Sequence, residues 1–489
     1  MATITSTGLG SGLDVSSIVS ALMSVEKRPL TLMQQAKTDL NTQLSAIGKL
    51  QSMTSAMRDA ANTLSSVTLW NQTKASSSDA ASVGVATDAA AASGTYNVNV
   101  SRLAVGQTIS SRAFTNAQST LGEGTLTIEL GSWTGEPTPT GFTAKTGATP
   151  VAVTIGPDDT TLEKVRDKIN AAGAGVTATI VNDASGARLA LRSSETGAEN
   201  AFRISASETS DDGVAGDGLS ALAFDAAEVV PDGGTAVSQM LRNQTAVNAQ
   251  ATINGIAITS ASNKLEGVAD GLTLTLLKTT TGDVEVGVKP DDDAVKTAVT
   301  TFTKAFNDLA AYIRDQTKYD AATKTGGTLQ GDRTAGGLQA QLRGVINAAS
   351  TASSVFTRLS DMGIAMKADG TLETNSTKLD AALANRAEMR KALATDGTDR
   401  AGSGFMDRFR DLGNALLDTT GALTTRTSSL QSMITRNQKS QDAMTLRLEQ
   451  TEKRLNAQYQ ALDTNMAKLS GLSNYLSGQL ASITNFNNN

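Results

Sequence analysis

The stretch "LQSMITRNQKSQDAMTLRLEQTEKRLNAQYQALDTNMAKLSGLSNYLSGQL" occupies residues 430–480 and carries apolar side chains at alternating steps of three and four. This spacing places one apolar stripe along a single helix face. A helix of about 50–60 residues is roughly 75–90 Å long, and no globular core buries that length. The stretch therefore predicts a long helix that pairs with a second helix. Its stripe consists of Leu423, Leu430, Ile434, Met444, Leu448, Leu455, Tyr459, Leu462, Met466, Leu469, Leu476, Leu480 and Ile483.

The N-terminal 70 residues carry the matching pattern. Apolar positions begin at Val15 and continue through Leu22 until Pro29 interrupts them, and the same spacing resumes at Met33. Asp14 is suited to cap the first helix, and Pro29 disfavours helix at the residue before it, so we expect a break there. The two ends are predicted to form an antiparallel coiled coil, with everything between them inserted at its far end.

The middle of the chain has the period of β-strands instead. "SVGVAT" (82–87) and "TYNVNV" (95–100) alternate apolar and polar residues. "NDASG" (182–186) and Asn254-Gly255 are typical of hairpin turns. Thr160 and Glu163 predict a capping box for a short helix. Residues 205–245 are rich in Gly, Asp and Ala and are expected to be loop-like.

After Pro290 the helical period returns. "DDDAVKTAVTTFTKAFNDLAAYI" (291–313) places seven apolar residues on one face, and Asp291 to Asp293 lie where the helix dipole favours negative charge. The inward residues are Val295, Ala298, Val299, Phe302, Phe306, Leu309 and Ile313.

These patterns predict an α+β multidomain fold, in which antiparallel terminal coiled-coil legs and a helical domain carry two inserted, mainly β head domains. The expected boundaries are as follows: a terminal helical leg domain at 1–42 and 455–489, a helical coiled-coil stem domain at 43–74 and 291–454, an inner β head domain at 75–120 and 247–290, and an outer β head domain at 121–246.

Composition argues against several classes of function. The 489 residues include no Cys and no His, so the chain has no thiolate nucleophile and lacks both the usual general base and the commonest metal ligand. The net charge of −6, without a basic stripe, argues against nucleic acid or a membrane surface as partner. We expect that the protein is not an enzyme and that it binds neither a metal ion nor a cofactor. Among enzymes, the alternative is a carboxylate-based hydrolase.

Gly8, Gly10 and Gly12 precede the first helix. A dinucleotide-binding loop needs a strand before it and a βαβ unit around it, and neither is present in the pattern. We interpret the three glycines as a hinge. With no Lys or Arg before Lys27, the N-terminus is not expected to be a cleavable secretory signal.

The extreme ends are predicted to lack a core of their own chain. Residues 13–25 and 471–489 are amphipathic, yet the intramolecular coiled coil is expected over 40–70 and 425–460. Two such ends imply a partner supplied by another chain. The predicted assembly interface comprises Leu13, Val15, Ile18, Val19, Leu22, Leu469, Leu472, Leu476, Leu480 and Ile483.

Several segments resemble the bacterial flagellar filament cap family, also called hook-associated protein two. They are "GLGSGLDVSSIVSALMSVEKRPL" (8–30), "LQGDRTAGGLQAQLRGVI" (329–346), "DGTLETNSTKLDAAL" (369–383) and the tail at 430–480. Residues 161–200 are similar to a repeat found in flagellin and hook-associated proteins.

The resemblance implies a ring-like homo-oligomer, expected to be a pentamer, at the tip of the growing filament. It further implies contact with flagellin, a chaperone for the C-terminal helix, and secretion through the flagellar type III export channel to the extracellular tip of the flagellum. The alternative is a surface adhesin that acts through the β head.

Overall fold

Asp14 and Pro29 set the start of the two N-terminal helices. In the computed structural model, which describes residues 14–210, 216–228 and 239–486, helix α1 (Val15–Glu26) begins after Asp14. The Asp14 carboxylate accepts a hydrogen bond from the Ser17 amide at 3.0 Å. Helix α2 (Arg28–Ser65) has Pro29 in its first turn, where a missing amide hydrogen costs nothing. A break between the two helices is confirmed, but it lies at Lys27, one residue before the expected position, because Arg28 is already the first residue of α2.

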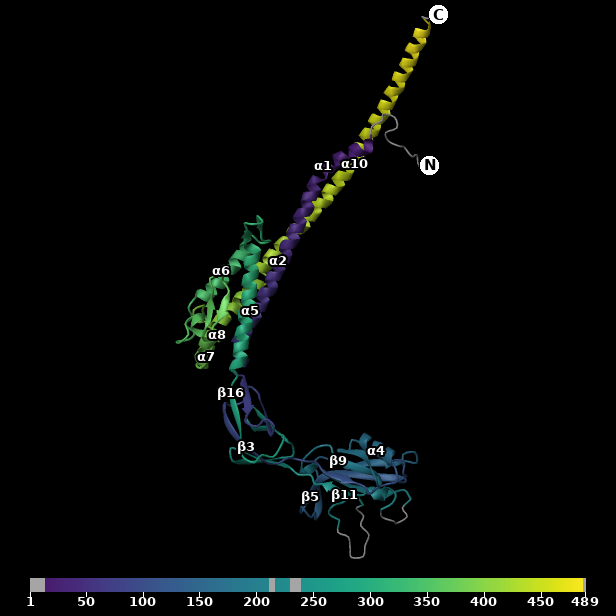
Figure 1. Ribbon diagram of the computed structural model, residues 1–489, viewed down its shortest axis with the longest axis vertical. Coiled ribbons are helices and arrows are strands. Elements are labelled where there is room, and N and C mark those ends of the chain that lie inside the picture. Colours follow the sequence, from purple (N-terminus) through teal and green to yellow (C-terminus); the bar gives the residue numbers. More distant parts are fainter. Residues whose placement is uncertain (1–13, 211–215, 229–238, 487–489) are drawn as a thin grey trace. The chain divides into compact units, whose positions relative to one another are not determined.

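The chain divides into a helical unit, Met1–Leu69 with Asp292–Asn489, and a sheet unit, Trp70–Asp291. In the helical unit α2 lies beside α5 (Asp292–Thr317), α9 (Phe405–Leu417) and the 65-residue α10 (Ala422–Phe486) (Figure 1). The seven residues predicted to face inward on α5 are all buried. The remaining elements are α3 (Val67–Trp70), α6 (Arg333–Asn347), α7 (Ser376–Leu383), α8 (Arg386–Ala394), η3 (Leu359–Met362), β17 (Tyr319–Asp320), β18 (Thr325–Gly326), β19 (Ile364–Met366) and β20 (Leu372–Thr374).

The sheet unit contains two separate hydrophobic cores. The first lies between a five-stranded antiparallel sheet, ordered β1-β16-β3-β12-β13, and a three-stranded sheet, ordered β14-β15-β2. Both sheets contribute to one core, in which Val98 and Val286 are packed with Leu274. The strands are β1 (Thr73–Ser77), β2 (Val83–Thr87), β3 (Gly94–Arg102), β12 (Ala249–Ile253), β13 (Ile256–Ser260), β14 (Lys264–Ala269), β15 (Leu272–Leu276) and β16 (Val284–Pro290).

The second core belongs to residues 109–246 and includes helix α4 (Leu162–Ala171). Its sheets are ordered β11-β4-β9-β8 and β10-β5-β6, with β7 also paired to β5. Trp133 belongs to this core, and its ring centroid lies 4.7 Å from that of Phe142. The strands are β4 (Thr108–Ser110), β5 (Gly124–Thr134), β6 (Gly141–Ala144), β7 (Val151–Ile155), β8 (Val176–Asp183), β9 (Gly186–Ser193), β10 (Ala201–Glu208) and β11 (Leu241–Gln244), with η1 (Ala198–Asn200) and η2 (Leu219–Leu222) between them.

Both predicted hairpin turns are confirmed. Asp183 pairs with Gly186 across the turn between β8 and β9. Asn254 and Gly255 have φ values of 49° and 80°, the left-handed conformation that a two-residue hairpin turn requires.

Two local predictions are wrong. The capping box at Thr160 does not form, because α4 begins one residue later, with Thr161 at the N-cap and no side-chain capping bond. The segment 205–245 is not a simple loop: η2 and Phe224 are buried in the second core. Phe224 exchanges both backbone hydrogen bonds with Ile204 of β10, which ties this part to the sheet. Residues 211–215 and 229–238 lie outside the described residues.

The α+β multidomain class is confirmed, with paired terminal helices and antiparallel sheets. The finer division into leg, stem, inner head and outer head domains stays a prediction.

Candidate assembly interface

The first helix packs along the C-terminal helix of the same chain. Val15, Val19 and Met23 of α1 are at most 5% exposed and form a small core with Leu448 of α10. Leu30, Met444, Leu455 and Tyr459 surround this core and are half-buried. Residues 15–25 therefore have a core within their own chain, contrary to expectation. The physical reason is that α10 is continuous and extends far enough to cover α1 beyond the break at Lys27.

Two side-chain contacts fix the antiparallel register of α2 and α10. Lys37 Nζ donates to Gln438 Oε1 at 2.5 Å, and Gln441 Nε2 donates to the carbonyl of Met33 at 3.3 Å. Gln441 is 8% exposed, so an amide is buried in an otherwise apolar seam. A polar side chain at such a position selects one register over neighbouring ones.

Beyond Tyr459 the apolar stripe of α10 continues, and no part of the chain that the structure describes covers it. Figure 1 shows α10 extending past the end of α1. Leu469, Leu472, Leu476 and Leu480 are 52–63% exposed, and Leu462, Met466 and Tyr475 are also exposed. Spacings of four and three separate Leu462, Met466 and Leu469, as in a coiled-coil seam. We call the exposed apolar side chains between residues 462 and 480 the tail stripe. They are Leu462, Met466, Leu469, Leu472, Tyr475, Leu476 and Leu480.

The predicted interface residues thus fall into three groups. The tail leucines lie together on the tail stripe, as predicted. Val15 and Val19 are buried against α10, Ile18 is half-buried and Leu22 is 40% exposed. The third group lies outside the described residues and consists of Leu13, together with the predicted hinge glycines at 8, 10 and 12. Ile483 belongs to α10, but its side chain is also outside the described part. The assembly role of every one of these residues stays a prediction.

Sequence reasoning left Leu462, Met466 and Tyr475 out of the interface. Leu462 and Met466 carried a usable signal, because both occupy positions of the same seam. Tyr475 gave no such signal, because it lies beside the seam position Leu476 and not on it.

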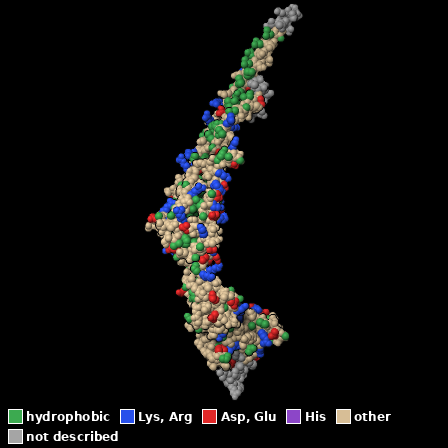
Figure 2. Space-filling view, turned by 60° about the vertical axis from the view of Figure 1, so that its left-hand side comes forward, with side chains coloured by type: hydrophobic (Ala, Val, Ile, Leu, Met, Phe, Trp, Pro, Cys, Tyr) green, Lys and Arg blue, Asp and Glu red, His purple; other side chains and the backbone are tan. Residues whose placement is uncertain are grey.

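The tail stripe itself contains no charged residue, and the segment that carries it, residues 462–480, has charges only at Asp463 and Lys468. Lys468 is the last charged residue of α10, and α1 has none from Val15 to Val25. Figure 2 shows the far end of α10 with hydrophobic and uncharged side chains, whereas Lys, Arg, Asp and Glu are frequent along the rest of the helical unit. Apolar surface depleted of charge is the composition found at the centre of protein–protein interfaces.

Asp14 is the one charged group at the start of α1. Hydrogen bonds from the Ser17 hydroxyl, the Ser17 amide and the Ser16 hydroxyl lower the pKa of Asp14 to about 2. The carboxylate therefore stays ionised throughout the physiological pH range. Its negative charge interacts favourably with the dipole of α1.

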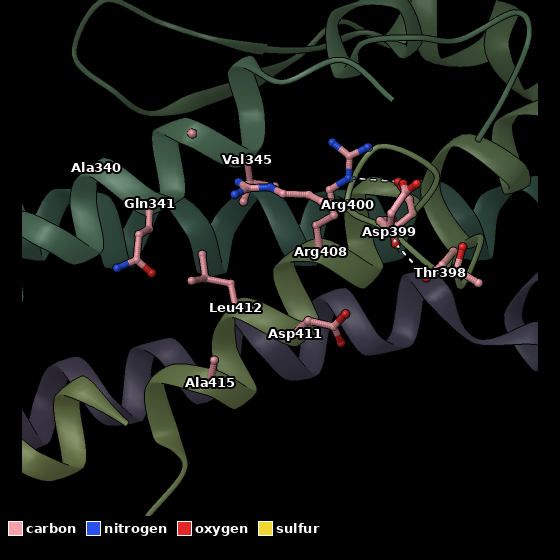
Figure 3. Close-up of a pocket in the computed structure, with 13 residues that line it drawn as sticks. Ala340, Gln341, Val345, Thr398, Asp399, Arg400, Arg408, Asp411, Leu412 and Ala415 are labelled. Carbon is pink, nitrogen blue, oxygen red and sulfur yellow. Dashed lines mark hydrogen bonds between the residues drawn. The ribbon is translucent and has the colours of Figure 1, made fainter. Parts of the chain in front are cut away.

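A cavity of about 690 Å³ lies between α6, α9 and the loop at 397–403 (Figure 3). Its buried charge is Arg408, whose guanidinium donates to the carbonyls of Ser403, Ala349 and Ala401 at 3.0–3.1 Å. These bonds show that Arg408 holds the loop against α9. We therefore assign Arg408 a structural role.

Asp407, the neighbouring residue on α9, is 1% exposed and forms an ion pair with Arg410. Burial raises the pKa of Asp407 above its usual range, and Arg410 opposes that shift. Asp407 lies in the interior of the helical unit and Arg410 is half-buried, and neither residue is part of the tail stripe.

Comparisons with known proteins show which family the chain belongs to. Residues 11–107 match the family model "Flagellar hook-associated protein 2 N-terminus", and residues 246–471 match the corresponding C-terminus model. Flagellar hook-associated protein 2 of Escherichia coli (strain K12) is 30% identical over 99% of this chain and 100% of its own length. The chain belongs to the flagellar hook-associated protein 2 family.

Another member of this family, the B-type flagellar hook-associated protein 2 of Pseudomonas aeruginosa, is 30% identical over 98% of both chains. Residues 142–195 match the flagellin hook IN motif, which lies in the second core. The crystal structure of the D1-D2-D3 domains of the flagellar cap protein FliD from Escherichia coli superposes with a TM-score of 0.58. It has 29% sequence identity and covers 79% of this chain and 99% of that one. Within the described residues, no helix is both long enough and apolar enough to span a bilayer.

Proposed function

We propose that this protein is a structural assembly factor that caps the tip of the bacterial flagellar filament and promotes incorporation of exported flagellin. The tail stripe is the observation that carries the proposal. It continues a seam that is buried elsewhere in the chain, and it is apolar, uncharged and uncovered among the described residues. Family membership and the flagellin hook IN motif support the same function.

In this proposal the partners are further copies of the chain and flagellin. The copies form a ring-like homo-oligomer, a pentamer on the filament, and the terminal helices are the legs that contact flagellin. Glycines 8, 10 and 12 act as a hinge of the leg. Isolated amphipathic helices are weakly stable, so contacts at the legs are individually modest and can be exchanged as subunits are added.

The protein is secreted through the flagellar type III export channel, and a chaperone holds the C-terminal helix beforehand. An uncovered apolar stripe favours association in the cytoplasm, which gives such a chaperone a physical purpose. The protein then acts outside the cell at the filament tip, as a structural protein and not as an enzyme.

A matched pair of substitutions on α10 tests the proposal. Leu476→Arg places a charge in the tail stripe, whereas Leu446→Arg places the same charge at a position outside the seam with similar exposure, 57% against 52%. Each gene replaces the native one, and filament length and flagellin released into the medium are measured. We expect Leu476→Arg to abolish filaments and release flagellin, because a charge in an apolar contact is strongly unfavourable. Leu446→Arg should leave both unchanged.

Removal of residues 1–25 is the second test. We expect the sheet unit to remain folded and filament growth to be lost. Normal filaments with this truncation, or equal filament lengths in the two arginine variants, would overturn the proposal.

A further inference from the structure

Strand β13 ends the five-stranded sheet and leaves its outer side open. Its partner is β12, joined through the turn at Asn254-Gly255, and the sheet order ends with β13 among the described residues. Ile253 and Ile256 flank a two-residue turn and therefore exchange both of their backbone hydrogen bonds. By alternation, the N–H and C=O groups of Ala257 and Thr259 point outward. β13 thus offers four backbone hydrogen-bonding groups along its free side.

The core face of the sheet is also unfinished at this strand. Ile256 and Ile258 pair with Ile253 and Ala251, so their side chains lie on the same face as those buried residues. Ile256 is nevertheless 67% exposed and Ile258 is half-buried. The three-stranded sheet that covers the core face therefore ends before β13.

Cavities lie on both faces of β13. One, of about 510 Å³, reaches from β13 to β14 and is lined by the apolar Ile258, Leu265 and Val268 and by the paired charges Lys264 and Glu266. The other, of about 250 Å³, is lined by Thr259 together with Trp133 and Glu136 of the second core. A strand added beside β13 would direct alternate side chains toward these two spaces, because successive side chains of a strand point to opposite faces.

Three other edge strands of the sheet unit, β8, β11 and β14, carry features that disfavour strand addition. On β8 the side chain of Asn170 accepts from the Ala178 amide at 2.7 Å and donates to its carbonyl at 2.9 Å, which occupies that edge. β11 and β14 have irregular registers and carry charge at Arg242 and Lys264. Such charges and bulges are how proteins keep sheet edges from pairing. β13, with the sequence IAITS, has no charge, no proline and a regular register.

We propose that β13 binds an extended peptide segment of another protein by strand addition. The segment has no sheet of its own and has apolar residues at alternate positions, which face the exposed Ile256 and the half-buried Ile258. The walls on both faces of β13 favour such an occupant, because a single extended strand fits between them whereas the edge of a folded domain brings its own packed layers. Backbone hydrogen bonds supply affinity in this mode, and the two cavities supply preference for side chains.

The inference stands on the geometry of β13 and does not depend on the proposed function. If that function holds, a newly exported filament subunit supplies such a segment before it folds. Peptide binding tests the edge without any filament, so its failure is distinguishable from a failure of filament growth.

The test uses the full chain and a fluorescent nine-residue peptide in which isoleucine or valine alternates with threonine or serine. We expect saturable binding, and slower hydrogen exchange at Ala257 and Thr259 when peptide is present. Ile256→Lys should weaken binding at least tenfold, and Ala257→Pro should abolish it by removing an outward N–H. Val181→Lys is the matched control, because Val181 is an exposed apolar residue on the protected edge β8, and it should bind as the native chain does.

A second control replaces alternate amides of the peptide by N-methyl amides, which removes donors and leaves the side chains in place. Loss of binding on N-methylation supports strand addition. Equal binding of the N-methylated peptide, undiminished binding by Ile256→Lys, or no binding to the native chain would each overturn it. A native oligomer that dissociates in Ile256→Lys and is not displaced by peptide would also overturn it, since the occupant would then be a second copy.

Discussion

Helix α10 carries one apolar stripe, and the two halves of this stripe differ in burial. Up to Tyr459 the stripe faces α2 and α1, and Leu430 and Leu448 are buried. From Leu462 to Leu480 the stripe is exposed. The spacing of apolar residues is the same in both halves, so periodicity determines where a helix is apolar but not what covers it. Burial depends on how far the partner segment extends, and this difference separates the folding surface from the proposed assembly surface.

The sharpest way to test this contrast is to shorten one leucine in each half. Leu448→Ala should lower the free energy of unfolding of the helical unit by about 2–5 kcal/mol, because it leaves a cavity between α1 and α10. Leu476→Ala should change it by no more than about 0.5 kcal/mol, because the side chain is already exposed. Denaturant unfolding followed by helical circular dichroism measures both. Equal losses of stability would mean that the tail stripe is covered in the monomer.

Much of this architecture could be predicted from local pattern. The inward face of α5 and the turn at Asn254-Gly255 follow from periodicity and turn chemistry alone. The burial of Val15 and Val19 could not be predicted, because it depends on how far α10 extends beside them. The open edge of β13 also escaped prediction, because strand order is set by contacts between residues far apart in sequence. Phe224 was missed because a segment rich in Gly and Asp gives no sign that one aromatic side chain anchors it.

The buried amide at Gln441 lies in the covered half and has no equivalent in the tail stripe. Gln441→Leu should raise the free energy of unfolding by about 1 kcal/mol, because an apolar side chain replaces a desolvated amide. It should also weaken the preference for one register. Spin labels on exposed positions of α2 and α10 would then show a broader distance distribution than in the native chain. A single narrow distribution would mean that Lys37 and Gln438 are sufficient to set the register.

A substitution at Asp407 tests whether a buried carboxylate lowers the stability of the helical unit, whereas an exposed one does not. Because burial raises its pKa, the folded state binds a proton more readily than the unfolded state does. The contribution of Asp407 to stability is therefore greatest below the unfolded pKa and is lost as pH rises through the folded pKa. Asp407→Asn should melt at a higher temperature than the native chain at pH 7, and this gain should shrink toward pH 4.

Asp411 is the matched control for this prediction, since it lies on the same helix, contacts the same Arg410 and is exposed. Asp411→Asn should produce no such gain. A lower melting temperature for Asp407→Asn at pH 7 would show that the ion pair with Arg410 outweighs the cost of burial.

The smallest expected effect is at Asp14, where the covered stripe of α1 begins. Asp14→Ala removes three hydrogen bonds to the first turn, so the first residues of α1 should exchange amide hydrogen faster while the rest of the helical unit is unchanged. Because the pKa of Asp14 is lowered to about 2, its stabilisation is present above the unfolded value of 3.8 and is lost as pH falls toward 2. Exchange at α1 in the native chain should therefore approach that of Asp14→Ala only in this acid range. Asp14→Asn keeps a capping side chain and should exchange at an intermediate rate. If the amides of α1 exchanged at the same rate in all three chains at pH 7, packing on α10 alone would hold α1 in place. The Asp14 cap would then have no part in determining where the covered half of the stripe ends.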